Sequence, residues 1–143
     1  MALVYFDTSA LVKLCVLETG SPLAVALWRR ADAVVTSRIA DSEVRSVLGA
    51  AERIGRLDAA PAGQARDRWN ELWPSLSKVE VTPAVADLSG DLTDRRPLRA
   101  GDAIHLASAM QLTDADMVFA AWDSRLAAAA TAEGLTVVPP TLA

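Results

Sequence analysis

The sequence predicts an α/β fold, a three-layer α/β/α sandwich around a central, mostly parallel sheet of four to five strands. Two observations lead to this class. Short, almost continuously apolar runs alternate with longer segments of helical periodicity, as in parallel sheets that helices cover on both faces. The 143 residues are also 52% hydrophobic and 22% charged, which is enough apolar material for a buried core.

Five short apolar runs are the expected strands, and helical patterns separate them. In chain order the runs are ALVYF at 2–6, AVVT at 33–36, KVEV at 78–81, MVFAA at 117–121 and LTVV at 135–138. No internal repeat, low-complexity tract or linker interrupts the alternation. We therefore expect a single domain over residues 1–143.

Seven segments have helical patterns. They cover about 9–18, 22–31, 39–54, 58–76, 83–94, 101–113 and 123–133. The third has one apolar face, made by Ile39, Val44, Val47, Leu48, Ala51 and Ile54. The fourth has a stripe with Trp69 and Trp73, expected in the core or at an interface. The sixth is apolar nearly all round, which predicts a core helix.

The composition argues against several classes of protein. No stretch reaches about 18 uncharged apolar residues, and the N-terminal apolar run ends at Asp7, so we expect neither a membrane span nor a signal peptide. Cys15 is the one cysteine, which excludes an internal disulfide and fits a reducing cytoplasm. The net charge of −4 argues against a broad nucleic-acid-binding surface, but it permits a nucleic-acid substrate held at one site through metal ions.

Two aspartates follow expected strands. Asp7 comes directly after the first strand, and Asp123 comes just after the fourth. Ligands of parallel α/β sheets bind beyond the carboxyl ends of the strands, so both side chains are expected at that rim. Helix capping is the alternative role for each of them. Thr8 and Ser9 offer other caps for the first helix, whereas for Asp123 capping is the stronger alternative.

Two further acids lie on expected core helices. Glu43 has Ile39 and Val47 as its i−4 and i+4 neighbours, so it stands in an apolar row and points toward the sheet. A buried ion pair with an arginine is its alternative role. Asp102 lies in the first turn of its helix, where the alternative is to complement the helix dipole.

Four ionised carboxylates near one edge of a sheet repel each other unless a cation is present. At about 5 Å and an effective dielectric of about 20, each close pair costs about 3 kcal/mol. Oxygen ligands without a partnering His or Cys suit Mg²⁺ or Mn²⁺, and a site of this kind suits phosphoryl chemistry. Thr8 and Ser9 are candidate contacts to a bound water or to the phosphate.

Four stretches of the chain form a recognisable series: YFDTSALVKL, VVTSRIADSEVRSVL, LRAGDAIHLASA and VFAAWDSRLAAAA. In their order and strand–helix contexts they resemble the PIN-domain ribonucleases, most closely the VapC-like toxins of bacterial and archaeal toxin–antitoxin pairs. The first and third stretches are the most specific. The resemblance covers essentially the whole chain and implies a PIN-like sandwich.

The resemblance also implies a function. Its acidic tetrad, which would bind Mg²⁺ or Mn²⁺, falls on Asp7, Glu43, Asp102 and Asp123, and Ser9 often belongs to the site. The family cleaves single-stranded or loop RNA with a metal-activated water, leaving 3′-hydroxyl and 5′-phosphate ends. As such a toxin, the protein would inhibit translation and growth. Its expected partners are a second copy of itself and a cognate antitoxin with a DNA-binding head, whose basic tail reaches the acidic pocket.

Three arginines closely precede Asp102. Arg95, Arg96 and Arg99 are candidate contacts to RNA phosphates, because arginine binds phosphate in a bidentate way. A solvated loop is the alternative. His105, three residues after Asp102 on the same helical face, is expected to be a core or rim histidine near the site.

Other functions stay open at this stage. A haloacid-dehalogenase-like phosphatase also begins with a strand and an aspartate, but it needs a second aspartate at the position of Ser9. A receiver-type phosphoacceptor needs an aspartate after the third strand, where Thr82 and Pro83 stand. A non-catalytic PIN-fold scaffold that binds RNA or protein would have a broken acidic set, and here all four positions are filled.

Overall fold

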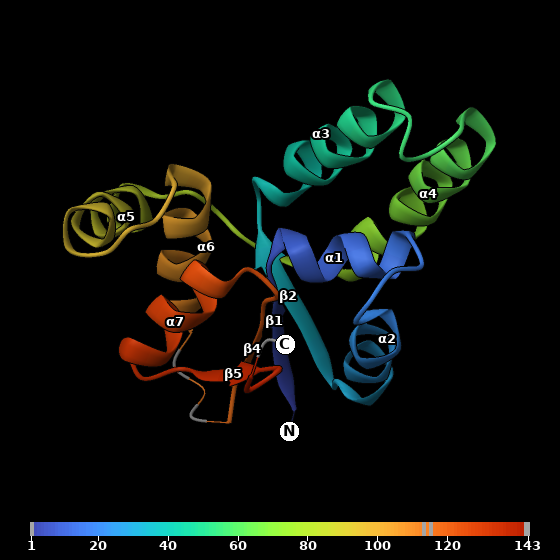
Figure 1. Ribbon diagram of the computed structural model, residues 1–143. Coiled ribbons are helices and arrows are strands. Elements are labelled where there is room, and N and C mark those ends of the chain that lie inside the picture. Colours follow the sequence, from blue (N-terminus) through green and yellow to red (C-terminus); the bar gives the residue numbers. More distant parts are fainter. Residues whose placement is uncertain (1, 113, 115, 142–143) are drawn as a thin grey trace.

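The computed structural model describes residues 2–112, 114 and 116–141 (Figure 1). Its centre is one sheet of five strands in the order β3-β2-β1-β4-β5, and every neighbouring pair is parallel. The strands are β1 (Leu3–Phe6), β2 (Ala33–Ser37), β3 (Ser77–Val79), β4 (Val118–Ala120) and β5 (Thr136–Val138). The predicted fold class and all five predicted strands are confirmed.

The central strand β1 is where the strand order reverses. Tyr5 of β1 pairs with Val35 of β2 on one side and with Phe119 of β4 on the other. From β1 the chain first builds β2 and β3 outward, and it returns later to add β4 and β5 on the opposite side. In open α/β sheets this reversal leaves a crevice beyond the carboxyl ends of the two central strands.

Helices cover both faces of the sheet (Figure 1). One layer consists of α1 (Thr8–Cys15), α2 (Ser21–Arg30), α3 (Ala40–Arg53) and α4 (Ala59–Leu72). The other layer consists of α5 (Pro83–Arg95), α6 (Ala100–Met110) and α7 (Ser124–Ala132). Because side chains alternate along a strand, Phe6 packs with the first layer and Tyr5 with the second.

The structure differs from the predicted helices in three details. The helix expected over 58–76 ends as an α-helix at Leu72, and a short 3₁₀ turn, Trp73–Ser75, follows with Pro74 inside it. On α3 only part of the expected apolar face is buried, because Val47 is 43% and Ile54 67% exposed. The helix expected over 101–113 ends at Met110, and residue 113 lies outside the described residues.

The tryptophan stripe, which runs from α4 into the 3₁₀ turn after it, belongs mainly to the core. Trp69 is fully buried, and its indole N–H donates to the Asp41 carboxylate at 2.9 Å. Trp73 is only partly buried and packs against the same core. None of the described helices combines the length and apolarity needed to cross a lipid bilayer.

Candidate functional site

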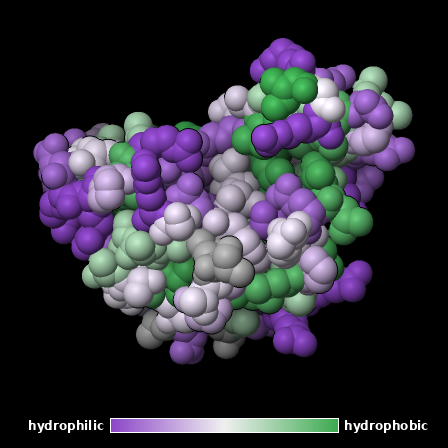
Figure 2. Space-filling model, in the orientation of Figure 1, coloured by the Kyte–Doolittle hydropathy of each residue, from purple (hydrophilic) through white to green (hydrophobic). Residues whose placement is uncertain are grey.

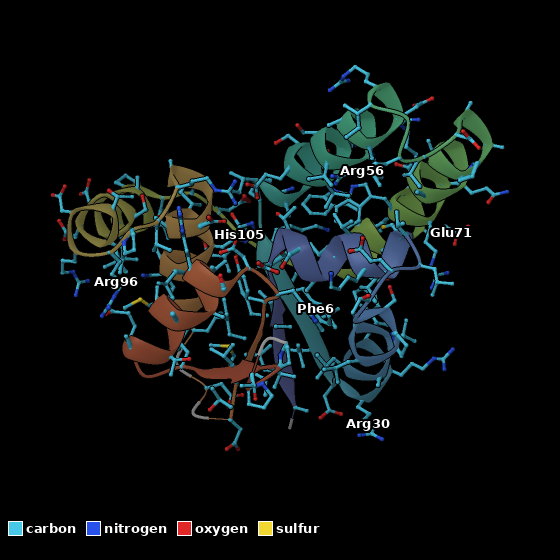
Figure 3. All side chains as sticks on the ribbon, in the orientation of Figure 1. Phe6, Arg30, Arg56, Glu71, Arg96 and His105 are labelled. Atoms are coloured by element: carbon cyan, nitrogen blue, oxygen red, sulfur yellow. The ribbon has the colours of Figure 1, made fainter. Side chains whose placement is uncertain are left out.

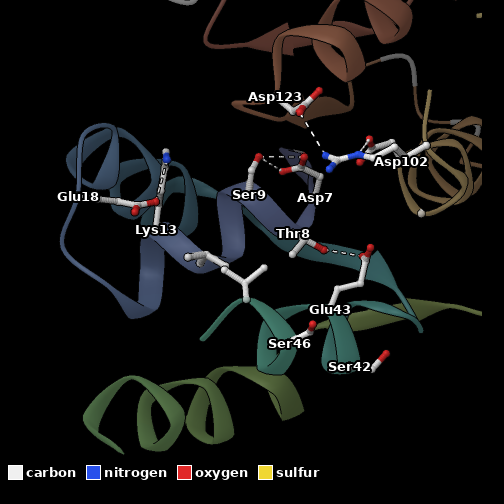
Figure 4. A pocket seen from close by; sticks show the side chains of 14 residues that line it. Asp7, Thr8, Ser9, Lys13, Glu18, Ser42, Glu43, Ser46, Asp102 and Asp123 are labelled. Carbon is white, nitrogen blue, oxygen red and sulfur yellow. Dashed lines mark hydrogen bonds and ion pairs between the residues drawn. The ribbon is translucent and has the colours of Figure 1, made fainter. Parts of the chain in front are cut away.

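A cavity of about 790 Å³ opens beyond the carboxyl end of β1, in the notch between α3 and α6 (Figures 2 and 4). Its walls come from α1, α3, the start of α6 and the loop after β4. All four acids singled out in the sequence line it: Asp7, Glu43, Asp102 and Asp123. The fold therefore gathers these four side chains around one opening.

Asp7 is the most deeply placed of the four acids. It follows β1, is only 3% exposed, and caps α1 by accepting a hydrogen bond from the Ala10 N–H at 2.9 Å. The Ser9 hydroxyl donates to its two carboxylate oxygens, at 2.7 and 2.9 Å. The expectation that Thr8 or Ser9 would cap this helix is therefore wrong, because α1 begins at Thr8 and the residue before it supplies the cap.

Burial makes Asp7 a weaker acid than an ordinary aspartate. Desolvation raises the pKa of its carboxyl from 3.8 to about 6, and the nearby Asp102 charge adds to the rise. His105 and the hydrogen bonds from Ser9 and Ala10 act in the opposite direction but do not cancel it. A carboxylate that is costly to ionise inside a cavity of other acids is well suited to a cation.

Thr8 and Ser9 both face the site, but each is engaged with a carboxylate. The Thr8 hydroxyl donates to Oε1 of Glu43 at 2.7 Å, whereas Ser9 binds Asp7. The backbone N–H of Trp122 donates to the Ser9 hydroxyl at 2.9 Å and so ties the end of β4 to α1. Their observed role in this structure is to hold the acids in place.

Glu43 lies on α3 and reaches across the cavity mouth toward α6. Its Oε1 accepts the Thr8 hydroxyl and lies 2.6 Å from Nε2 of His105. Burial raises the pKa of Glu43, but the hydrogen bonds and charge of its partners outweigh this and hold the pKa below its ordinary value. The arginine partner considered from the sequence is wrong, since the buried partner is His105.

Arg99 joins the remaining two acids. Its Nε lies 3.3 Å from Oδ2 of Asp102, and its Nη2 lies 3.6 Å from Oδ2 of Asp123 (Figure 4). Desolvation raises the pKa of Asp102, with the charge of Asp123 adding to it and Arg99 opposing it. Asp123 also caps α7, accepting the Leu126 N–H at 2.9 Å, while it lines the cavity.

The three candidate arginines separate in the structure. Arg99 lines the cavity, whereas Arg95 and Arg96 form ion pairs with Glu133 at 3.3 and 2.6 Å and do not line it. Arg96 lies toward the outer edge of the molecule, and His105 lies near its centre (Figure 3). The structure therefore brings only Arg99 to the site.

Two residues that matter here were not given a role from the sequence. Gly101 lies so close to Glu43 that a Cβ atom would meet Oε2 at 2.5 Å. His105 was expected only as a neighbour, although its position three residues after Asp102 was a usable signal. Its contact with Glu43 depends on how α6 approaches α3, which the spacing does not reveal.

The donor chemistry of the cavity fits a hard divalent cation. Carboxylate and hydroxyl oxygens line it, as Mg²⁺ and Mn²⁺ prefer. Among the described residues, no three Asp, Glu, His or Cys side chains are arranged to hold a metal ion as they stand. The Arg99 guanidinium is a positive charge that lies between two of the acids, Asp102 and Asp123.

Comparisons with known proteins agree with this architecture. The sequence matches the PIN domain family over residues 4–132. It is 45% identical over 142 residues to Ribonuclease VapC49 of Mycobacterium tuberculosis, covering 99% of each chain. Among solved structures, VapC20 of M. tuberculosis, described as a sarcin-ricin loop cleaving toxin, superposes with a TM-score of 0.68 at 20% identity, over 93% of this chain and 96% of the other. A chain of a toxin–antitoxin complex from Klebsiella pneumoniae superposes with a TM-score of 0.63 at 20% identity, over 98% of this chain and 99% of the other.

Proposed function

This chain belongs to the PIN domain family, and on that premise we propose that it is an endoribonuclease toxin whose active site is the acidic cavity. The observation that carries the proposal is the meeting of Asp7, Glu43, Asp102 and Asp123 around one opening at the switch point of the sheet. The reaction is hydrolysis of an RNA phosphodiester bond. Water adds at phosphorus, the bond to the 3′ oxygen breaks, and the ends are a 3′-hydroxyl and a 5′-phosphate.

We propose that the four acids hold Mg²⁺ or Mn²⁺. When bound, such an ion neutralises charge on the phosphate and lowers the pKa of a coordinated water. Two features support a cation here: the raised pKa values of Asp7 and Asp102, and the guanidinium that already bridges Asp102 and Asp123. Both features favour positive charge in the cavity.

The remaining residues of the cavity orient these groups and the RNA. Ser9 fixes both oxygens of Asp7, and Thr8 fixes one oxygen of Glu43. Arg99 is 78% exposed at its side chain, so it is free to exchange its carboxylate partners for an RNA phosphate. A phosphate contact from Arg95 or Arg96 would first require loss of the Glu133 ion pairs.

A partner protein follows from the same assignment. An antitoxin with a basic tail complements a cavity lined by four acids, and the solved relative from K. pneumoniae is a toxin–antitoxin complex. We also propose that the toxin forms a homodimer. The lone Cys15 agrees with action in a reducing cytoplasm.

The deciding experiment is cleavage of structured RNA by the purified protein with Mg²⁺ or Mn²⁺, and with EDTA. Asp7→Asn and Asp102→Asn should abolish cleavage, and EDTA should do the same. Asp91→Asn is the matched control, because Asp91 is exposed on α5 and does not line the cavity.

Three results would overturn the assignment. Cleavage that survives both site variants and EDTA would place the active site elsewhere. RNA binding without cleavage by the unaltered protein would favour the non-catalytic scaffold. An acid-stable aspartyl phosphate formed with a small phosphomonoester would favour the phosphatase.

A further inference from the structure

We propose that His105 is a positioning residue for Glu43. Together with Thr8 it occupies Oε1, so that Glu43 offers its other oxygen, Oε2, to the cavity. This inference rests on the proposed function, because it concerns how one acid of that site is presented. It assigns the one histidine of the chain a task without placing it against metal or RNA.

Both nitrogens of the His105 ring are engaged, and the ring is buried. The side chain is 1% exposed. Nδ1 lies 2.8 Å from the Tyr5 hydroxyl, and Nε2 lies 2.6 Å from Oε1 of Glu43 and 3.0 Å from the Thr8 hydroxyl. The ring therefore bridges the first strand of the sheet and the cavity.

The direction of the hydrogen bonds follows from the chemistry of the groups. An ionised carboxylate accepts hydrogen bonds only, so Nε2 of His105 carries the proton that Glu43 accepts. In the neutral ring Nδ1 is then an acceptor, and the Tyr5 hydroxyl donates to it. The Tyr5 hydroxyl, both ring nitrogens of His105 and Oε1 of Glu43 thus each have a partner of the right kind.

The far end of this chain is anchored in the core. The Tyr5 ring is fully buried and stacks on Phe119 of β4, with 5.3 Å between centroids and 12° between planes. Tyr5 also meets the His105 ring edge to face at 5.8 Å. Because Tyr5 is fixed in the core, it holds the His105 ring in place, and the ring in turn holds the Glu43 carboxylate.

Glu43 needs such support because of where it stands. Its side chain is 31% exposed and comes from α3, on the opposite wall of the cavity from α6. Within the described residues Oε2 has no hydrogen-bond partner, and it faces Gly101 on the cavity wall. A long side chain with a free end samples several rotamers, whereas a metal ligand must be held in one.

His105 does not act on substrate directly. It is absent from the cavity lining among the described residues, and both ring nitrogens are already bonded. Its effect therefore has to pass through Glu43. Loss of an outer partner of a metal ligand typically lowers metal affinity or activity about 10- to 100-fold.

A matched pair of variants separates positioning from packing. In His105→Gln the amide nitrogen replaces Nε2 and keeps a donor for Glu43, whereas in His105→Asn the shorter amide replaces Nδ1 and keeps only the Tyr5 partner. Both variants are polar and smaller than histidine. The readouts are Mn²⁺ affinity by electron paramagnetic resonance without RNA, kcat and KM for RNA cleavage, and the thermal midpoint of unfolding.

The expected result is a split between the two variants. His105→Asn should lose about 10- to 100-fold in Mn²⁺ affinity and in kcat, and His105→Gln should recover most of both. In an E43Q background the His105→Asn substitution should cause no further loss of Mn²⁺ affinity. Thr8→Val, which removes the second bond to Oε1 from a partly exposed position, should weaken Mn²⁺ binding in the same direction.

Other outcomes overturn the inference. Equal Mn²⁺ affinities of His105→Asn, His105→Gln and the unaltered protein would show that the histidine serves packing alone. If His105→Asn lowers Mn²⁺ affinity in the E43Q background as much as it does alone, His105 acts on metal binding by a way other than Glu43. If the His105 variants fail to fold, an unchanged Mn²⁺ affinity in Thr8→Val overturns it.

Results that refute the proposed function differ from results that refute the positioning role of His105. If the unaltered protein binds Mn²⁺ but cleaves no RNA, the nuclease assignment fails, and the affinity comparison still decides the role of His105. If the unaltered protein cleaves RNA and all variants bind and cleave equally, only the positioning role fails. If the unaltered protein binds no Mn²⁺, there is no ligand set to position and both fail.

Discussion

Gly101 of α6 lies against the carboxylate of Glu43 of α3, so closely that a Cβ atom at position 101 would lie 2.5 Å from Oε2. The tip of a glutamate can normally move aside. Here Thr8 and His105 hold Oε1, so moving Oε2 breaks hydrogen bonds that fix the acid. The missing side chain is what lets Glu43 keep its place at the cavity mouth.

Gly101→Ala should therefore impair activity more than folding. We expect RNA cleavage and Mn²⁺ affinity to fall about 10- to 100-fold as Glu43 is displaced from its partners. The free energy of unfolding should change little. Ala is up to about 1 kcal/mol more favourable than Gly in a helix, and this gain offsets the cost of displacing the Glu43 carboxylate. Cleavage rates and urea unfolding of the same preparations provide the measurement.

Gly63→Ala is the control for this prediction. Gly63 lies inside α4, where an added Cβ would meet nothing within 4 Å. It should gain stability and keep full activity. Full activity in Gly101→Ala as well would show that Glu43 tolerates displacement and contradict the role given to this contact.

Arg99 contacts Asp102 and Asp123, so under the proposed function it competes with a cation for them. In Arg99→Gln we expect divalent metal to bind about two- to fivefold more tightly, a small change because the guanidinium is exposed and screened by solvent. RNA affinity should fall, and the logarithmic salt dependence of RNA binding should become shallower by about one.

The metal effect is measured by Mn²⁺ titration of Arg99→Gln against the unaltered protein. The RNA effect is measured by RNA binding across a salt series in an uncleaving Asp7→Asn background. Arg95→Gln is the matched control, since Arg95 pairs with Glu133 away from the cavity. An equal loss of RNA affinity in both variants would indicate a general charge effect and not a contact at the site.

The sequence carried enough information to place the sheet and its acidic rim. Apolar runs that end in Asp7 or just before Asp123 identify strand ends, and parallel strands put those ends at one edge. The order of the strands then brings β4 beside β1, so the two aspartates become neighbours. These features depend on local pattern and on general rules of topology.

Features that depend on helix phase and crossing could not be predicted in the same way. Arg96 and Arg99 are three residues apart, yet one pairs with Glu133 and the other enters the cavity. The partnership of His105 with Glu43 depends on the approach of α6 to α3, which no spacing within one helix encodes. The cap of α1 depended on where the first helical turn begins, one residue earlier than expected.

Asp123 caps α7, and the proposed function also gives it a chemical role; two substitutions separate the two. Asp123→Asn keeps an oxygen for the Leu126 N–H, so the cap of α7 and the stability should persist, while cleavage falls at least about tenfold. Asp123→Ala should lose activity equally and lose about 1 kcal/mol of stability in addition. Urea unfolding and cleavage assays distinguish the two; near-normal cleavage by Asp123→Asn would remove this residue from the site.

Asp7 should destabilise the metal-free protein at neutral pH. Its carboxyl pKa rises from 3.8 to about 6 on burial, so the folded state binds the proton more tightly than the unfolded state. The penalty is absent below pH 4, grows as the pH rises toward 6, and then stays constant. A shift of this size corresponds to about 3 kcal/mol at pH 7.

Asp7→Asn removes that penalty and keeps an oxygen for the Ala10 N–H. In EDTA we expect the variant to be about 1 to 3 kcal/mol more stable than the unaltered protein at pH 7.5, because the amide pairs less well with Ser9, and to lose this advantage by pH 4. Mg²⁺ or Mn²⁺ should stabilise the unaltered protein and leave the variant almost unchanged. Urea unfolding from pH 4 to 7.5 with and without metal measures both effects, with Asp91→Asn as the exposed control. A variant that is less stable at every pH by the same amount would show that Asp7 acts mainly as a helix cap and carries no burial penalty for a cation to relieve.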